Sequence, residues 1–292
     1  MTTTLLLDIG NTRIKWAIWE GKIDSDRRVL LDHHDYLFHK DIGKLLQIWQ
    51  NIPVPSHVFG ACVTQEGIRQ RVETAVKMRW GNAVYSEWLT PLSECAGLKC
   101  LYENPQQLGI DRWLSAIAAW KQVQSACLVV NSGTALTVDA ISDQGEFLGG
   151  IVVPGIEAMR EGLFKRAPTL RRHSSAITDD YIATAYSDMI IDFPTNTDSA
   201  IETGLWRALS GAVHEQHDRL LAYCGRQTPV SIWLAGGNAE RLASLIAVPY
   251  KIVHDLVLQG SAWQAIHLHT PAQASSDAEH NESNSIVVAA SL

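Results

Sequence analysis

The sequence predicts an α/β protein made of two related halves. Two loops rich in Gly, Asn and Thr, residues 8–15 (the first loop) and 131–139 (the second loop), each follow a short apolar run. Glycine stands at the same offset in both, as Gly10 and Gly133. Each loop leads into another strand-like stretch, and helix-like and strand-like spacing then alternate. A hairpin followed by βα units, present twice, favours a duplicated α/β architecture.

The first half begins with the hairpin around the first loop. Helical spacing predicts a helix over 41–51 capped by Asp41, a helix capped by Thr64, and a helix that carries Trp113 and ends near residue 124. Apolar runs predict strands at 3–9, 14–20, 29–34, 58–63 and 83–89.

The second half restarts with the same order of elements. Helical spacing predicts helices over 156–166 and 197–217. Residues 236–238, Gly-Gly-Asn, follow the last buried run as a tight turn. The strands are expected at 127–130, 136–141, 147–153 and 230–235.

These elements predict two domains and a tail. We place the first domain at residues 1–124, with the first loop, and the second at 125–269, with the second loop and the Gly-Gly-Asn turn. Beyond residue 269 the composition shifts to Ala, Ser, Asp, Glu and Asn. Such a segment lacks the apolar surface needed to offset the entropy of ordering it, so residues 270–292 are expected to be a disordered tail.

Composition narrows the classes of function. The chain has 292 residues, 46% of them hydrophobic, so a sizeable core is expected. Its net charge of −7 disfavours a nucleic-acid partner. No basic leader precedes an apolar stretch and no run is long enough to span a bilayer, so we expect no membrane association. Five scattered cysteines favour reduced thiols and a cytoplasmic location.

The composition of both loops suits the binding of phosphate. Gly, Asn and Thr at a strand-to-strand turn leave backbone N–H groups accessible, and Thr hydroxyls or Lys15 can add donors. The alternative is a pair of ordinary hairpins, because the same residue types dominate turns. Repetition of the pattern within one chain favours two halves that close on the phosphates of a nucleotide.

Four short motifs support a more specific interpretation. They are Asp8-Ile9-Gly10-Asn11-Thr12 with Lys15, Gly109-Ile110-Asp111-Arg112, Ser132-Gly133-Thr134-Ala135, and Asn196-Thr197-Asp198-Ser199-Ala200-Ile201. In this order and spacing they resemble the motifs of the type III pantothenate kinases, a family that also includes proteins named Bvg accessory factor. The resemblance extends over about residues 3–265.

The resemblance implies a fold and an activity. The family belongs to the actin-like superfamily of acetate and sugar kinases, so it implies two duplicated ribonuclease-H-like domains with mixed sheets and flanking helices. It implies transfer of phosphate from ATP to pantothenate, the first step of coenzyme A synthesis, with Mg²⁺ as the divalent ion. It also implies a homodimer and a requirement for a monovalent cation, K⁺ or NH₄⁺.

The nucleotide side of the site follows from the same resemblance. Asp8 stands where the superfamily places a carboxylate linked to Mg²⁺, although a strand-end Asp can instead accept hydrogen bonds from turn N–H groups. Lys15 can add positive charge. The residues that the resemblance assigns to ATP are Asp8, Ile9, Gly10, Asn11, Thr12, Arg13, Ile14, Lys15 and Thr134. The turn at 236–238 resembles the adenosine motif of the superfamily, or is simply a tight strand-to-helix turn.

The acceptor side centres on Asp111. A carboxylate can orient the acceptor hydroxyl and take its proton, so Asp111 is the expected base. It stands just before an apolar helical pattern, and the alternative is a helix N-cap. Arg112 offers a planar fork to a carboxylate or a phosphate. The resemblance assigns substrate binding to Tyr102, Gly109, Ile110, Asp111, Arg112 and Thr197. For Thr197, which in the family acts close to the dimer interface, the alternative is again an N-cap.

One position departs from the family pattern. Many members carry Asp where this chain has Asn131, and that Asp is tied to the monovalent cation; a neutral carbonyl oxygen is a weaker ligand. Two other functions stay open from the sequence alone. The chain could be a non-catalytic nucleotide-binding accessory protein that affects gene expression, or an actin-like kinase with another acceptor. Intact Asp8, Asp111 and Arg112 favour the pantothenate kinase.

Overall fold

Two mixed β-sheets organise the computed structural model, which describes residues 3–82, 84–173 and 192–269. The first sheet has five strands in the order β3-β2-β1-β4-β5, and the second has seven in the order β12-β11-β8-β9-β10-β7-β6. The strands are β1 Thr4–Ile9, β2 Arg13–Ile23, β3 Val29–Phe38, β4 His57–Cys62, β5 Tyr85–Trp88, β6 Glu94–Cys95, β7 Leu98–Cys100, β8 Cys127–Ser132, β9 Ala135–Ile141, β10 Glu146–Pro154, β11 Ser231–Ala235 and β12 Tyr250–Ile252.

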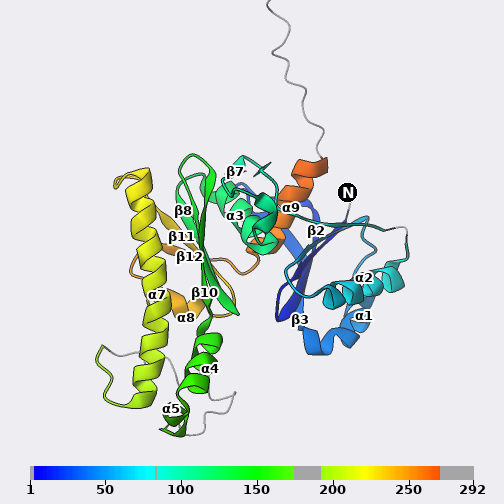
Figure 1. The fold of residues 1–292 in the computed structure, drawn as a ribbon. Coiled ribbons are helices and arrows are strands. Elements are labelled where there is room, and N and C mark those ends of the chain that lie inside the picture. Colours follow the sequence, from blue (N-terminus) through cyan, green and yellow to red (C-terminus); the bar gives the residue numbers. More distant parts are fainter. Residues whose placement is uncertain (1–2, 83, 174–191, 270–292) are drawn as a thin grey trace, which may run out of the picture.

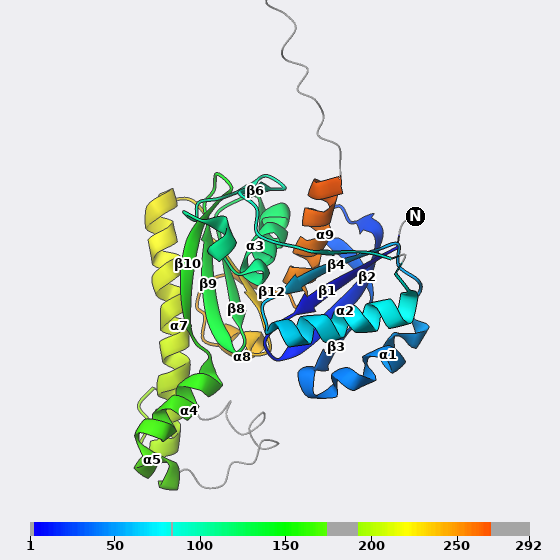
Figure 2. The same cartoon turned by 45° about the vertical axis from the view of Figure 1, so that its right-hand side comes forward.

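Helices cover both sheets, and α3 and α9 lie between them (Figures 1 and 2). The predicted α/β class, with mixed sheets and flanking helices, is confirmed. The helices are η1 His39–Lys44, α1 Leu45–Ile48, η2 Trp49–Asn51, α2 Glu66–Trp80, η3 Pro105–Gln107, α3 Ile110–Val123, α4 Ile156–Arg166, α5 Pro168–His173, α7 Thr197–Cys224, α8 Ala239–Ala243 and α9 Leu256–His269. Of the helices in the described ranges, none is long and apolar enough to cross a membrane.

Strand β1 is buried along its whole length because helices cover both faces of its sheet. Leu5 and Leu7 point into the core beneath α1 and α2, whereas Leu6 points into the core that contains α3 and α9. Its apolar run is therefore continuous, as expected for a strand covered on both sides. β1 pairs antiparallel with β2 and parallel with β4, and both pairings end beside the first loop.

Strand β8 holds the same position in the second sheet. Leu128 and Val130 face a core closed by α7 and α8, while Cys127 and Val129 face the core shared with α3 and α9. β8 pairs antiparallel with β9 and parallel with β11. The two hairpins β1–β2 and β8–β9 are therefore equivalent elements of the two halves, as the duplicated pattern predicts.

The helices α3 and α9 cross at the level of their backbones. A Cβ atom added to Gly260 of α9 would lie 1.9 Å from the carbonyl oxygen of Leu114 in α3, so only glycine fits at this crossing. α9 also contacts β1 and β4, so the last described helix packs against the first strand.

Several local expectations were wrong. The predicted helix over 41–51 is a short α-helical turn between two 3₁₀ segments, and Asp41 pairs with Lys44 instead of capping a helix. Thr64 caps nothing, because α2 begins at Glu66 after an N-cap residue that makes no side-chain bond. α7 continues past the predicted end to Cys224.

The predicted domain limits remain a prediction. Strands β6 and β7 precede the expected boundary at residue 124, yet β7 pairs parallel with β10 and extends the second sheet. Conversely, α9 belongs to the predicted second domain but packs on the first sheet. The chain thus crosses between the sheets more than once. The expected tail at 270–292 lies outside the described residues.

Candidate active site

The first and second loops meet side chain to side chain. The hydroxyl oxygens of Thr12 and Thr134 lie 3.1 Å apart, within hydrogen-bonding distance, and either can donate. Both residues are exposed, so their hydroxyls can also reach a ligand. Two hairpin turns from different sheets thus converge at one place, as the sequence predicts for loops that grip one polyphosphate.

The glycines of the loops act by leaving space. The N–H of Gly10 donates to Arg13 O at 3.0 Å and that of Gly133 to Ala135 O at 2.9 Å, so these two N–H groups close the turns and are not free for phosphate. Added Cβ atoms would make no close contact with protein atoms at either glycine. What each glycine provides is therefore room for a ligand to approach the backbone.

Asp8 is a buried carboxylate in a crowded acidic environment. Its side chain lies at the end of β1, 8% exposed, directly across the hairpin from Lys15. Burial raises the pKa of Asp8 to about 6; the charge of Lys15 opposes the rise, while Asp111 and Asp255 add to it. Lys15 in turn donates from Nζ to the backbone oxygen of His254 at 3.3 Å.

Three other residues predicted to bind ATP face away from the loop opening. Ile9 and Ile14 are fully buried in the core of the first sheet, so only their backbone could contact a nucleotide. The guanidinium of Arg13 lies 4.8 Å from the ring centroids of both Tyr36 and Phe38 on β3. These contacts hold its charge over the aromatic edge strand.

Asp111 lies inside the first turn of α3, so the expectation that it precedes the helix as an N-cap was wrong. Gly109 is the N-cap residue, without a side-chain bond, and Asp111 Oδ1 accepts the N–H of Arg112 at 2.9 Å. A Cβ on Gly109 would lie 2.7 Å from that oxygen, which explains the glycine. Burial raises the pKa of Asp111, against the effect of the Arg112 N–H and charge.

Arg112 is held by a residue that the sequence did not reveal. Its Nε donates to both carboxylate oxygens of Asp139, at 3.0 and 3.2 Å, and its Nη2 also bonds Oδ1. Its Nη1 donates to the Tyr102 hydroxyl at 3.1 Å. Tyr102 and Arg112, predicted together, are thus in contact. The sequence did not single out Asp139, because it is one polar residue in an ordinary alternating strand pattern. The one signal in the sequence was its position at the end of the second loop.

Asn131 lies where the second loop meets the Gly-Gly-Asn turn. A Cβ on Gly236, whose φ is +95°, would lie 2.6 Å from Asn131 Oδ1 and 2.4 Å from Ser132 O. The N–H of Asn238 donates to Ser132 O at 3.0 Å. The predicted adenosine motif is therefore a tight turn pressed against the second loop, and its first glycine is required by both φ and space.

Thr197 is not brought to Asp111 within this chain. It is the first residue of α7, which begins beside α4 and α5, away from α3 (Figure 1). The N-cap is Asn196, whose side chain accepts the Ser199 N–H at 2.9 Å, so the alternative role of Thr197 as N-cap was wrong.

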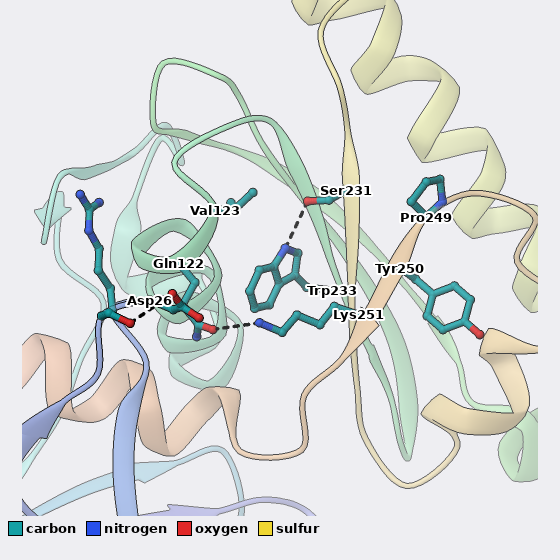
Figure 3. Close-up of a pocket in the computed structure, with 10 residues that line it drawn as sticks. Asp26, Gln122, Val123, Ser231, Trp233, Pro249, Tyr250 and Lys251 are labelled. Atoms are coloured by element: carbon teal, nitrogen blue, oxygen red, sulfur yellow. Dashed lines mark hydrogen bonds between the residues drawn. The ribbon is translucent and has the colours of Figure 1, made fainter.

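A cavity of about 590 Å³ lies at the opposite end of α3 from Asp111. It opens between the β2–β3 turn and the first residues of β11 and β12 (Figure 3). Lys251 reaches from one wall toward Gln122 Oε1, at 3.4 Å, and lies 4.6 Å from the Trp233 ring centroid. Neither loop lines this cavity, so it is separate from the candidate active site.

Comparison with known proteins gives a consistent match. A family model for type III pantothenate kinase matches residues 4–219. The type III pantothenate kinase of Nitrosomonas eutropha is 37% identical over 272 residues, which cover 88% of this chain and 92% of that protein. That of Methylibium petroleiphilum is 32% identical over 265 residues, covering 88% and 96%.

A solved structure resembles the fold. A ROK family glucokinase from Streptomyces griseus, in complex with glucose and AMPPNP, aligns with a TM-score of 0.51 at 11% identity, covering 89% of this chain and 98% of the glucokinase. At that identity the likeness concerns the fold alone, and it agrees with the predicted actin-like class.

The burial of Asp8 predicts a stability that depends on pH. Because its folded pKa of about 6 lies above the unfolded value of 3.8, the proton stabilises the fold below pH 3.8, and this contribution disappears as pH rises through 6. Without Mg²⁺ and nucleotide, Asp8→Asn should gain about 2–3 kcal/mol over wild type between pH 4 and pH 7.5, measured by urea unfolding. Asp32→Asn, at an exposed position of β3, is the control. An Asp8→Asn effect that is equal at both pH values would contradict the assignment.

Proposed function

Because the chain belongs to the type III pantothenate kinase family, we propose that the two loops and the start of α3 form the site at which it phosphorylates pantothenate with ATP. The product, 4′-phosphopantothenate, is the first intermediate of coenzyme A synthesis. The observation that carries the assignment of the site is the 3.1 Å contact between Thr12 and Thr134, which joins two hairpin turns from different sheets. An assay of ADP release with pantothenate, beside a panel of sugars and carboxylic acids, tests it.

The proposed mechanism relies on positioning and charge. Phosphoryl transfer asks a protein chiefly to align donor and acceptor and to stabilise the charge that develops. The Thr12 and Thr134 hydroxyls and the loop N–H groups would hold the phosphates, and Lys15 would supply positive charge beside Asp8. The Gly236 turn lies next to the second loop, which suits an adenosine group bound behind the phosphates.

Asp111 would serve as the base. A carboxylate that accepts the proton of a primary hydroxyl works better when its pKa is raised, and burial does this to Asp111. The first turn of α3 and the Arg112 N–H fix the carboxylate orientation. Arg112 beside it would bind the pantothenate carboxylate, with Tyr102 in contact.

The acidic surroundings of Asp8 fit a divalent cation. Burial is the main cause of the raised pKa of Asp8, and the charges of Asp111 and Asp255 add to it, so a bound cation would stabilise the ionised Asp8 carboxylate. In the described ranges no group of three or more His, Cys, Asp or Glu residues could hold a metal alone. This suits Mg²⁺, which is commonly held by one or two carboxylates together with substrate phosphates. Asp8 would hold it, and the ion would neutralise phosphate charge.

Asn131 would be the side-chain ligand of the monovalent cation. Its carbonyl oxygen faces the Gly236 turn, among backbone oxygens of the second loop. A neutral amide gives K⁺ or NH₄⁺ a weaker field than a carboxylate does. The cation would therefore depend mainly on backbone carbonyls in this chain.

A homodimer through α7 would place Thr197 near a second copy. The predicted apolar stripe of α7 does not face a partner, because Leu209 and Val213 are buried against β8 and β9 of the same chain. The opposite face is exposed and carries small residues at helical spacing, which lets two helices approach closely. These residues are Ala200, Gly204, Ala208 and Gly211. An isologous contact would use this stripe twice.

A cytoplasmic setting fits the chemistry of the chain. All five cysteines are unpaired thiols, as expected where glutathione keeps thiols reduced. The net charge of −7 argues against a nucleic-acid partner.

Replacing Asp111 tests its role as base. Asp111→Asn should lower kcat by about 10²–10⁴-fold, the usual contribution of general base catalysis, while binding of an ATP analogue stays measurable by calorimetry. Exposed Asp218→Asn on α7 controls for the loss of a carboxylate elsewhere. If Asp111→Asn keeps more than about a tenth of kcat, the carboxylate is not the base.

Restoring a carboxylate at position 131 tests the cation site. Asn131→Asp should lower the concentration of K⁺ needed for half-maximal activity, because a charged oxygen strengthens the field at the ion. The KM for ATP at saturating K⁺ should change little. Activity would be measured over a K⁺ titration at constant ionic strength. An unchanged K⁺ dependence, with wild type already saturated at low millimolar K⁺, would remove Asn131 from the site.

A charge placed in the small-residue stripe tests the dimer. Ala208→Arg should shift the protein toward monomer in sedimentation velocity at micromolar concentration, because a long charged side chain separates the two helices. Met78→Arg, 69% exposed on α2, should leave the assembly unchanged. A fully active wild-type monomer would exclude the dimer as the active unit.

A further inference from the structure

We propose that Asp139 is a positioning residue of this kinase: it holds Arg112 so that one end of the guanidinium is left to recognise the carboxylate of the acceptor. The inference rests on the proposed function and adds the group that selects an acceptor bearing a carboxylate. Asp139 itself would touch neither substrate nor nucleotide.

The location of Asp139 makes it a rigid support. It lies on β9, between Val129 of β8 and Gly150 of β10, and is 1% exposed. Arg112 reaches it from the first turn of α3, the helix that also carries Asp111. The ion pair therefore fixes the helix end that bears the proposed base to a central strand of the second sheet.

Asp139 and Tyr102 do not use all the N–H donors of the Arg112 guanidinium. A guanidinium has five N–H groups. The Nε group and one N–H of Nη2 go to Asp139, and one N–H of Nη1 goes to Tyr102 Oη. One N–H remains on each of Nη1 and Nη2. Two donors on neighbouring nitrogens match the two oxygens of a carboxylate, which Arg commonly binds in a bidentate manner.

Two glycines of β10 make room for this arrangement. A Cβ on Gly150 would lie 2.4 Å from Asp139 Oδ1 and 2.2 Å from Val138 O. Gly149, with φ of +111°, sits at an irregularity in the pairing with β9, beside the Tyr102 ring. Any side chain at Gly150 would displace the carboxylate that orients Arg112. Gly149 and Gly150 thus help to hold Asp139 and Tyr102 in place against Arg112.

Arg112 is the positive member of this ion pair. Burial raises the pKa of Asp139 to about 6, and Arg112 opposes the rise. Arg112 keeps its own proton: burial lowers its pKa, but Asp139 and Tyr102 together raise it further than burial lowers it. The acceptor carboxylate would therefore meet a guanidinium that is partly neutralised and fixed in direction.

The experiment measures acceptor selection in the full-length enzyme. We expect Asp139→Asn to raise the KM for pantothenate by about 10–100-fold, the usual effect of weakening a hydrogen bond to a charged group, with the KM for ATP unchanged. We also compare kcat/KM for pantothenate with that for its alcohol analogue, which lacks the carboxylate. Asp139→Asn should reduce this preference by at least about tenfold.

A matched control separates positioning from stability. Glu202 of α7 is another buried carboxylate, 3% exposed, that binds Arg160 through Nε at 2.8 Å and Nη2 at 2.9 Å. Glu202→Gln should cost stability like Asp139→Asn but leave the preference for the carboxylate unchanged. If Asp139→Asn fails to fold, Asp139→Glu keeps the charge but moves the carboxylate by one methylene group, and it should lower the same preference.

The outcomes are distinct. A loss of preference in Asp139→Asn or Asp139→Glu, without one in Glu202→Gln, supports the proposal. An active wild type whose preference persists in Asp139→Asn, or in Asp139→Glu where Asp139→Asn does not fold, overturns the proposal and leaves the ion pair a structural contact. A wild type that releases no ADP with pantothenate overturns the proposed function itself.

Discussion

The crossing of α3 and α9 at Gly260 is the constraint on which the rest of the arrangement depends. Backbone contact with Leu114 leaves these helices no freedom to slide, and they lie between the two sheets. Asp111 lies in the first turn of α3, and α9 begins two residues after His254, whose carbonyl oxygen accepts a hydrogen bond from Lys15. The close approach at Gly260 thus joins the helix that carries the proposed base to the helix that lies beside the Lys15 contact.

Burial of charge is the second feature that unites the site. Asp8, Asp111 and Asp139 each have a raised pKa, and in each the largest cause is removal from water. Removal from water is costly for a carboxylate unless a cation or hydrogen-bond donors compensate. The Arg112 guanidinium compensates the charge of Asp139, and the Arg112 backbone N–H donates to Asp111. The charge of Lys15 opposes the rise in the pKa of Asp8. In the proposed site Asp139 is thus paired with Arg112, whereas the carboxylates of Asp111 and Asp8 can still bind substrate and ion.

The sequence predicted what local composition determines and missed what distant contacts determine. Both loops were predictable because turn residues between apolar runs specify a hairpin wherever it lies. Asp139 was not, because its partner Arg112 is far along the chain and a single Asp in a strand has no signature. Strands β6 and β7 are two and three residues long and exist through pairing, of β7 with β10 and of β6 with β7. The helix expected at 41–51 broke into short turns because the buried Trp49, stacked on Trp80, overrides local propensity.

The packing of α9 against β1 has a consequence for how the chain acquires its fold. β1 leaves the ribosome first and α9 last among the described elements, yet Leu6 of β1 lies in the core that α9 closes. Contacts between residues so distant in sequence carry a large loop-closure entropy and slow the search for the native state. During synthesis one face of the first sheet therefore stays only partly covered until α9 is made. The core that α9 shares with the first sheet can therefore be completed only after α9 has been synthesised.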